Sequence, residues 1–483
     1  MLNDWQDFYT RRLYNRIQDC FNRPINSAPG AWLSVMQRDF RNGDSDMVLT
    51  GSSVTALNLS SYNYLGFAES ELELRTEVCA SLWKFGVSSC SSRSELGTTT
   101  EHLDLENRIA KFLGKEAAMI CGMGFGCNSF ILPALMGKDD LILSDELNHS
   151  SIVTGSRLSE ATVRVFRHNC PRSLERELRR AISRGKPRTY RPWKRIMVCT
   201  EGLFSMEGEL CALAEISRVC KKYKAYLYVD EAHSIGALGN TGRGIAEHAG
   251  VDPKEVDIFM GTFTKSFGSV GGYIASTHDV IHLLKRTSPA HMQACSMSVA
   301  CIKQASLALQ FIQGEDGTDR GQKKLDAIKE NANMFRDGLK KMGLQVIGDY
   351  DSPVVPALLF NPAKIPAFSR ECLARKLAVV VVGFPATPLL KSRIRFCISA
   401  AHSKKDLISA LKVIEQVSAK CMIQYKRESY WMRINRWIVI CRSSISCTML
   451  MFLVINLCVV KNPKILASSF WNFGGSHLIS TSF

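Results

Sequence analysis

Short apolar runs alternate with segments of helical periodicity between residues 101 and 285. Each run is four or five residues long and is followed by a small or charged residue. This pattern predicts a mostly parallel sheet covered by helices, because strands buried on both faces need no alternating polar positions. The predicted strands are residues 118–121, 141–144, 162–166, 196–200, 225–229, 258–261 and 272–275.

Different patterns lie on either side of this region. The spacing of apolar residues predicts an amphipathic helix over residues 1–22, a strand over 57–65 and a helix over 69–86. Beyond residue 298, helical and strand-like runs alternate on a smaller scale. Helices are predicted there at residues 299–312, 323–341 and 403–417, and strands at residues 344–347, 354–360 and 378–382.

We therefore predict an α/β protein made of four parts. They are an N-terminal helical and extended arm, a large domain with the mostly parallel sheet, a smaller C-terminal α/β domain, and a divergent hydrophobic tail: residues 1–65, 66–300, 301–420 and 421–483. Residues 443–460 carry no charge and are long enough for a short membrane span. The tail is either a membrane anchor or an abnormal terminus, and we favour the second because the preceding helix already completes a globular domain.

Charge and cysteine content narrow the function classes. The net charge is +16, and seven basic residues and one acidic residue place about +6 of it in the last 63 residues. An excess of basic residues favours binding to nucleic acid, to an anionic membrane face or to phosphorylated small molecules. Basic residues do not alternate with aromatic ones, so nucleic-acid binding is not expected. The 17 cysteines lack metal-site spacing, so we expect no metal site and reduced thiols in a cytosol-facing protein.

The clearest chemical signature is the segment GTFTKSFGSVGG, residues 261–272. It places Lys265 among small, hydroxylated and glycine residues directly after a predicted strand. A lysine in this loop could simply face water, although packing explains its neighbours poorly. We predict that Lys265 binds an aldehyde cofactor covalently and that Thr262 and Thr264 hydrogen-bond to its phosphate.

A second segment, YVDEAHSIG, places an acidic residue at the end of an apolar strand. Ligands of parallel sheets bind beyond the C-terminal ends of the strands. Asp230 is therefore predicted to keep the cofactor's pyridine nitrogen protonated, since a nearby negative charge favours the protonated form. His233 could hydrogen-bond to the ring hydroxyl. The alternative for Asp230 is a capping role in the following turn.

Three weaker signals complete the candidate site. In CGMGFGCN, residues 121–128, a glycine cluster lies between a strand and a helix, and its backbone N–H groups suit a phosphate. His149, in DELNHSS, could stack on the cofactor ring or be a structural residue. The segment RIRFC places Arg393 and Arg395 on one face of a strand. Arg395 could hold an amino-acid carboxylate through its guanidinium group, or pair with a structural acid.

Together these segments resemble the α-oxoamine synthase family of fold-type I pyridoxal-phosphate (PLP) enzymes. The likeness covers residues 5–417 and is carried by LNLSSYNYLGFAES, DELNHSSIVTGSR, EGLFSMEGELCALAEI, CKKYKAYLYVDEAHSIGALGNTGRG and GTFTKSFGSVGGYIA. Within the family it is greatest to the lysine-bearing second subunit of plant enzymes that join L-serine to palmitoyl-CoA. The resemblance implies a PLP-dependent transferase with a large sheet domain and a smaller C-terminal domain.

The resemblance also implies roles for individual residues. Lys265 would bind PLP covalently, Asp230 would pair with its ring nitrogen, His233 would lie beside its ring oxygen, and His149 would stack on the ring. The phosphate would be held by four residues, Gly124, Phe125, Thr262 and Thr264. The turn at residues 294–300 lacks the family's usual threonine and proline and leaves Ser296 and Ser298 as candidate donors.

The implied reaction condenses L-serine with palmitoyl-CoA to 3-ketosphinganine, CoA and CO2, the first step of sphingolipid synthesis. Arg395 would bind the serine carboxylate, and the loop at residues 384–388 would close over the acyl-CoA. The implied assembly is a heterodimer with a related subunit that lacks the lysine, on the cytosolic face of the endoplasmic reticulum membrane. Two alternatives remain: a sister enzyme that uses glycine or alanine with a shorter acyl-CoA, and an inactive splice-type isoform that acts as a scaffold.

Overall fold

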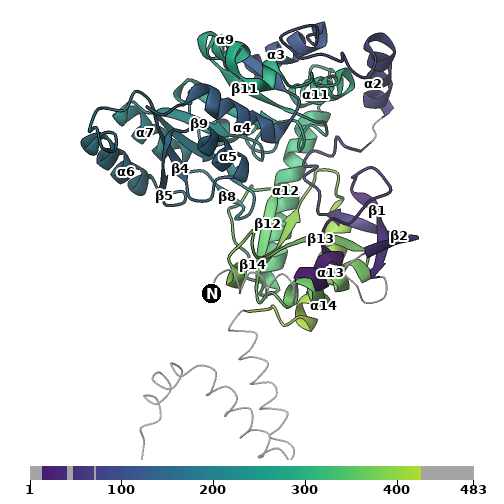
Figure 1. The fold of residues 1–483 in the computed structure, drawn as a ribbon. Coiled ribbons are helices and arrows are strands. Elements are labelled where there is room, and N and C mark those ends of the chain that lie inside the picture. The colour runs from purple at the N-terminus through teal and green to yellow at the C-terminus, as the bar shows by residue number, and fades with distance from the viewer. Residues whose placement is uncertain (1–13, 41–46, 70–71, 426–483) are drawn as a thin grey trace, which may run out of the picture. The chain divides into compact units, whose positions relative to one another are not determined.

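The computed structural model describes residues 14–40, 47–69 and 72–425 (Figure 1). The uncharged segment 443–460 lies outside the described residues, as does almost all of the predicted tail. Within the part of the chain that is described, no helix combines the length and apolar character needed to cross a bilayer.

A seven-stranded sheet forms the centre of the large domain. Its strands are the seven apolar runs predicted from the sequence, and the order across the sheet is β3-β11-β10-β9-β6-β4-β5. Strand β11 runs antiparallel to both of its neighbours, and the other neighbouring pairs are parallel. The bounds are β3 (Ala117–Cys121), β4 (Leu141–Asp145), β5 (Thr162–Phe166), β6 (Ile196–Glu201), β9 (Tyr226–Asp230), β10 (Ile258–Thr262) and β11 (Gly272–Ser276).

Helices cover both faces of this sheet because successive strand residues point to opposite sides. Val198 and Val229 pack in a core cluster with residues of α3 (Thr100–Leu113), α6 (Pro171–Arg184) and α7 (Leu213–Tyr223). Met197 and Tyr228, one residue earlier in each strand, pack with residues of α4 (Gly124–Leu135), α5 (Ser150–Leu158) and α9 (His278–Thr287). The fully buried strands account for the continuous apolar runs in the sequence.

The smaller domain is built on a five-stranded sheet of order β1-β2-β13-β14-β12. Two of its strands come from the N-terminal part of the chain, and β2 pairs parallel to β13. Residues that are about 320 positions apart, such as Leu57 and Leu377, therefore lie side by side. The bounds are β1 (Trp32–Phe40), β2 (Met47–Leu59), β12 (Val354–Phe360), β13 (Leu377–Val382) and β14 (Ser392–Cys397).

The remaining elements connect or cover these two sheets (Figure 1). Helices α12, α13 and α14 supply buried side chains to the core of the five-stranded sheet. The bounds are α2 (Leu72–Phe85), α8 (Ile245–His248), α10 (Pro289–Met292), α11 (Val299–Gln313), α12 (Arg320–Lys341), α13 (Lys364–Ala374), α14 (Lys404–Lys420), η1 (Tyr14–Cys20), η2 (Pro253–Glu255), η3 (Leu389–Lys391), β7 (Leu203–Phe204) and β8 (Glu209–Leu210).

Three local predictions were wrong. Residues 344–347 form no strand, and only Val346 makes a bridge, to Ala357. The pairing stops at Ile347 because Pro356 opposite it has no N–H, and the Ile347 carbonyl accepts a hydrogen bond from the buried Arg336 at 2.8 Å instead. The strand predicted to reach residue 65 ends at Leu59. In the predicted N-terminal helix, the described residues form only the short 3-10 helix η1, and residues 1–13 lie outside the description.

Candidate active site

A cavity of about 280 Å3 opens at the C-terminal ends of β6, β9 and β10, beside the first turn of α4. This is where ligands of parallel sheets bind. The structure brings together around it eight of the large-domain residues that the sequence singled out: Gly124, Phe125, His149, Asp230, His233, Thr262, Thr264 and Lys265.

Lys265 follows the end of β10 and reaches into the cavity, with its Nζ atom 5.8 Å from the centre of the Tyr62 ring. Burial lowers the pKa of Lys265 to about 8, although the carboxylates of Asp230 and Glu201 oppose the shift. At pH 7 about a tenth of the population therefore carries Lys265 as a neutral amine. A neutral amine is the form that can attack an aldehyde or accept a proton.

Asp230 lies at the end of β9, with only 4% of its surface exposed. Its Oδ1 atom accepts a hydrogen bond from the backbone N–H of Ala232 at 2.8 Å, and Oδ2 accepts one from Nδ2 of Asn128 at 2.7 Å. Asn128 is held in turn by the hydroxyl of Tyr228, which donates to Oδ1 of Asn128 at 2.7 Å. The carboxylate is thus fixed in one orientation at the cavity wall. The bond to Ala232 is the turn-capping contact considered as an alternative, and it leaves the role beside the ring nitrogen as a prediction.

His233 and His149 line the cavity at different points. Nδ1 of His233 lies 2.8 Å from the hydroxyl of the buried Tyr64, which leaves Nε2 for a ligand. Burial, reinforced by the positive charge of Lys265, lowers the pKa of His233 well below its usual range, so the ring is neutral. His149 precedes α5, and its Nδ1 lies 2.7 Å from the Ser151 hydroxyl.

The residues predicted to bind the phosphate lie beside the start of α4. The hydroxyl of Thr262 is buried and has no hydrogen-bond partner among the described residues. Gly124 begins the helix opposite it, and a Cβ atom at Gly124 would lie 2.7 Å from the Thr262 methyl group. A buried hydroxyl without a hydrogen-bond partner destabilises the fold unless a ligand supplies the partner. A helix N-terminus supplies further N–H donors for an anion.

Arg395 reaches the site from the small domain through Tyr62. Its guanidinium carbon lies 4.7 Å from the Tyr62 ring centre, on the ring that Lys265 also approaches. No carboxylate pairs with Arg395 among the described residues, whereas Arg393 pairs with Glu207 at 3.1 Å. The structural alternative therefore applies to Arg393, and Arg395 keeps a guanidinium for a substrate.

Two residues of the site were not predicted. Tyr62 lies between Lys265, Arg395 and His233, whose ring centre is 5.0 Å from its own. Glu201 ends β6 and lines the cavity, and it accepts the backbone N–H of His149. Burial, with the charge of Asp230, raises the pKa of Glu201 well above its usual range. Its position at a strand end was the available signal, the same one that identified Asp230.

The prediction for Ser296 and Ser298 is not supported within this chain. The Ser296 hydroxyl donates to the carbonyl of Gly97 at 2.5 Å, and the Ser298 hydroxyl donates to the carbonyl of Val87 at 2.7 Å. Neither residue lines the cavity around Lys265; both line a neighbouring one of about 390 Å3. Their hydroxyls are already used in fixing the turn.

These features fit PLP. The cavity offers an amine for its aldehyde, a fixed carboxylate for its ring nitrogen, a neutral histidine for its ring oxygen, and an unsatisfied hydroxyl at a helix N-terminus for its phosphate. The described residues contain no group of histidine, cysteine and acidic side chains suited to a metal ion. The fold and the site define a PLP-dependent transferase.

The chain belongs to the aminotransferase class I and II family, whose model matches residues 54–414. It is 57% identical to long chain base biosynthesis protein 2a of Arabidopsis thaliana over 420 residues, 87% of this chain and 86% of that protein. Serine palmitoyltransferase 2 of Dictyostelium discoideum is 50% identical over 428 residues, 88% of this chain and 87% of that one. The solved serine palmitoyltransferase of Sphingomonas wittichii superposes with a TM-score of 0.76 at 26% identity and covers 88% of this chain and 99% of its own.

Proposed function

We propose that this chain catalyses the PLP-dependent condensation of L-serine with palmitoyl-CoA to 3-ketosphinganine, CoA and CO2. The observation that carries the proposal is the arrangement around Tyr62. The Lys265 amine lies 5.8 Å and the Arg395 guanidinium 4.7 Å from its ring centre. An amino acid whose carboxylate binds Arg395 can therefore present its α-carbon toward Lys265. Relatives named serine palmitoyltransferase, with 50% identity over most of the chain, support the choice of substrates.

The residues of the chain have separate tasks in this reaction. Bound PLP would supply an electron sink that stabilises negative charge on the α-carbon of serine. Arg395 binds the serine carboxylate, and the neutral amine of Lys265 accepts the α-proton. Asp230 keeps a fixed negative charge at the cavity wall, and His233 donates from Nε2.

The overall reaction balances when one proton is taken from water. The α-carbon of serine loses its proton and forms a bond to the carbonyl carbon of the thioester, and the carbon–sulfur bond breaks to release CoA. The bond between the α-carbon and the serine carboxylate then breaks to release CO2, and a proton returns to the α-carbon.

The assembly that we propose is inferred from the same resemblance to serine palmitoyltransferases. We propose a heterodimer with a related subunit that lacks the lysine, attached to the cytosolic face of the endoplasmic reticulum membrane. Co-purification of a tagged full-length chain and fractionation of cell membranes test these two points. Recovery of the chain alone, in the soluble fraction, would contradict both.

The catalytic proposal is tested with the full chain, purified alone and after co-expression with such a subunit. Release of CoA is measured with L-serine and palmitoyl-CoA, and with glycine or alanine and acetyl- or succinyl-CoA. Release that requires serine and palmitoyl-CoA, with an equal amount of CO2, supports the proposal. Release only with the second substrate set identifies the sister reaction. Covalently bound PLP with no release in either preparation identifies the inactive scaffold.

A further inference from the structure

A short hairpin that follows β6 lies beside the arginine pair of the small domain. Its strands are β7 and β8, in which Leu203 pairs with Leu210 and Phe204 pairs with Glu209. The turn closes through Gly208, whose N–H donates to the carbonyl of Phe204 at 2.7 Å. Gly208 has a φ of +68°, and a Cβ atom there would lie 2.8 Å from the carbonyl oxygen of Val354. The turn is therefore in close contact with the start of β12.

The tip of the hairpin contacts both arginines of β14. Nη1 of Arg393 donates to the backbone carbonyl of Met206 at 2.7 Å and lies 3.1 Å from Oε1 of Glu207. Nη1 of Arg395 lies 3.5 Å from the sulfur of Met206. Arg393 is 3% exposed, so Glu207 compensates a charge that water hardly reaches. The hairpin therefore touches the carboxylate-binding arginine directly and its neighbour by an ion pair.

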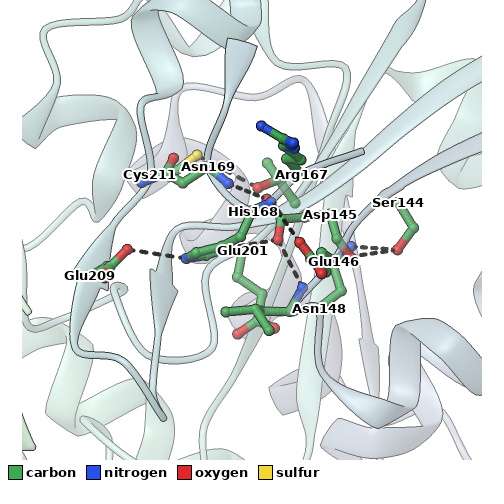
Figure 2. Close-up of polar contacts among 12 residues, drawn as sticks. Ser144, Asp145, Glu146, Asn148, Arg167, His168, Asn169, Glu201, Glu209 and Cys211 are labelled. Atoms are coloured by element: carbon green, nitrogen blue, oxygen red, sulfur yellow. Dashed lines mark hydrogen bonds and ion pairs between the residues drawn. The ribbon is translucent and has the colours of Figure 1, made fainter. Parts of the chain in front are cut away.

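The base of the hairpin is held to the large domain by His168. Figure 2 shows the ring between two carboxylates, with Nδ1 2.7 Å from Oδ1 of Asp145 and Nε2 3.2 Å from Oε2 of Glu209. Burial disfavours the charged ring, but the hydrogen bonds to Asp145 and Glu209 outweigh it and raise the pKa of His168 to about 10. The ring also packs edge-on against Phe204 at 4.4 Å. A positive charge thus joins the end of β4 to β8 throughout the physiological pH range.

A rigid loop of the small domain supports the opposite side of the hairpin. Oδ2 of Asp349 accepts the N–H of Leu210 at 2.8 Å, and the N–H of Asp349 donates to the carbonyl of Gly208 at 3.0 Å. The loop is itself fixed by the fully buried Arg336, which donates to the carbonyls of Ile347 and Val354 at 2.8 and 3.1 Å. The hairpin is therefore bonded to both domains.

We propose that this hairpin sets the position of the Arg395 guanidinium relative to Lys265, with Glu207 and His168 as its positioning residues. The two functional groups lie on different domains, and an error of about 1 Å in their separation is enough to lower a rate by about 100-fold. The hairpin touches both the strand bearing Arg395 and the sheet bearing the cofactor residues, and so forms one of the connections between them. The substrate group whose binding depends on this position is the α-carboxylate of a small amino acid. The inference therefore rests on the role proposed for Arg395.

Ligand binding to the PLP-loaded full-length protein tests the inference without requiring turnover. Affinities for L-serine and for serinol, which has the amine but no carboxylate, are measured from the absorbance of the bound cofactor. We expect Glu207→Gln to weaken L-serine binding about tenfold and to leave serinol binding within about twofold. The reason is that the carboxylate is the group that Arg395 binds, and serinol has none. The conservative Glu207→Asp variant should recover most of the loss. His168→Gln should cause the same selective loss, and Glu177→Gln, at a half-buried ion pair with Arg180 in α6, serves as the matched control.

A double-mutant comparison separates positioning from general damage. If Glu207 acts through Arg395, adding Glu207→Gln to Arg395→Lys should cause little further loss, whereas independent effects would add. Met206→Leu nearly conserves volume and removes only the sulfur contact, so it provides a second variant if Glu207→Gln does not fold. We expect it to weaken L-serine binding about two- to threefold with serinol binding unchanged.

The outcomes distinguish this inference from the proposed function. Equal weakening of L-serine and serinol, or fully additive losses with Arg395→Lys, would overturn the positioning role. Unchanged L-serine affinity in both Glu207→Gln and Met206→Leu would do the same. A wild-type protein that binds L-serine but releases no CoA would contradict the proposed function and leave the binding comparison intact.

Discussion

The two sides of the cavity hold their charged groups in different ways. On the large-domain side, Asp230 is 4% exposed and accepts hydrogen bonds from Asn128 and Ala232 at 2.7 and 2.8 Å. On the small-domain side, Arg395 is similarly buried at 7% exposed, but its side-chain hydrogen bonds go to the sulfurs of Met206 and Cys397. Its Nε atom has no partner among the described residues.

This difference separates a permanent ligand from a transient one. A carboxylate fixed by two donors is already in place for a cofactor that stays bound through every turnover. A guanidinium with weak contacts keeps its strong hydrogen bonds for a carboxylate that enters and leaves. The aromatic face of Tyr62 stabilises the waiting charge without competing for those hydrogen bonds.

The largest effect is expected from removing the amine on the large-domain side. In Lys265→Ala, the cofactor has no covalent attachment and the α-proton has no base, so we expect CoA release to fall by at least about 10³-fold. Borohydride reduction followed by peptide mapping should label Lys265 in the wild type and nothing in the variant. The exposed Lys254→Ala serves as the control. A label on another lysine would show that the assignment is wrong.

The next prediction tests the fixed carboxylate. Asp230→Asn keeps the side-chain shape but removes the negative charge, so the cofactor ring nitrogen is no longer held protonated. We expect kcat to fall on the order of 100-fold, with the cofactor still bound. Measured kcat and the absorbance spectrum of the variant check this, and Asp252→Asn, at an exposed helix start, is the control. A loss of less than about threefold would place the ring nitrogen elsewhere.

The sequence predicted the large-domain side better than the small-domain side. Asp230 ends β9 and Lys265 follows the fully buried β10, and parallel strands bring such positions to one edge, so local pattern was enough. Arg393 and Arg395 lie on the same face of β14, and only the fold reveals which of them meets an acid. That acid, Glu207, is 186 residues away. Tyr62 escaped prediction for the same reason, because its neighbours come from distant parts of the chain.

The pH dependence of cofactor loading tests the environment of Lys265. With a pKa of about 8, lowered by burial, the neutral amine falls about tenfold for each pH unit below that value. The rate at which apoprotein binds PLP covalently should rise about tenfold per unit up to roughly pH 8 and then level off. The rise of the absorbance band of bound cofactor measures it. A rate that continues to climb toward pH 10 would indicate an ordinary, exposed lysine.

A smaller effect is expected on the small-domain side, from Arg395→Lys. The charge is retained but the two parallel donors are lost, so L-serine should bind with a KM about tenfold higher and a nearly unchanged KM for palmitoyl-CoA. Arg370→Lys, at an exposed bidentate pair with Asp19, is the matched control and should change neither constant. If the KM for palmitoyl-CoA rises instead, Arg395 faces the acyl-CoA and the carboxylate of serine is held elsewhere. The comparison between the two sides would then contrast two substrate sites, because the weakly held guanidinium would be waiting for a CoA phosphate.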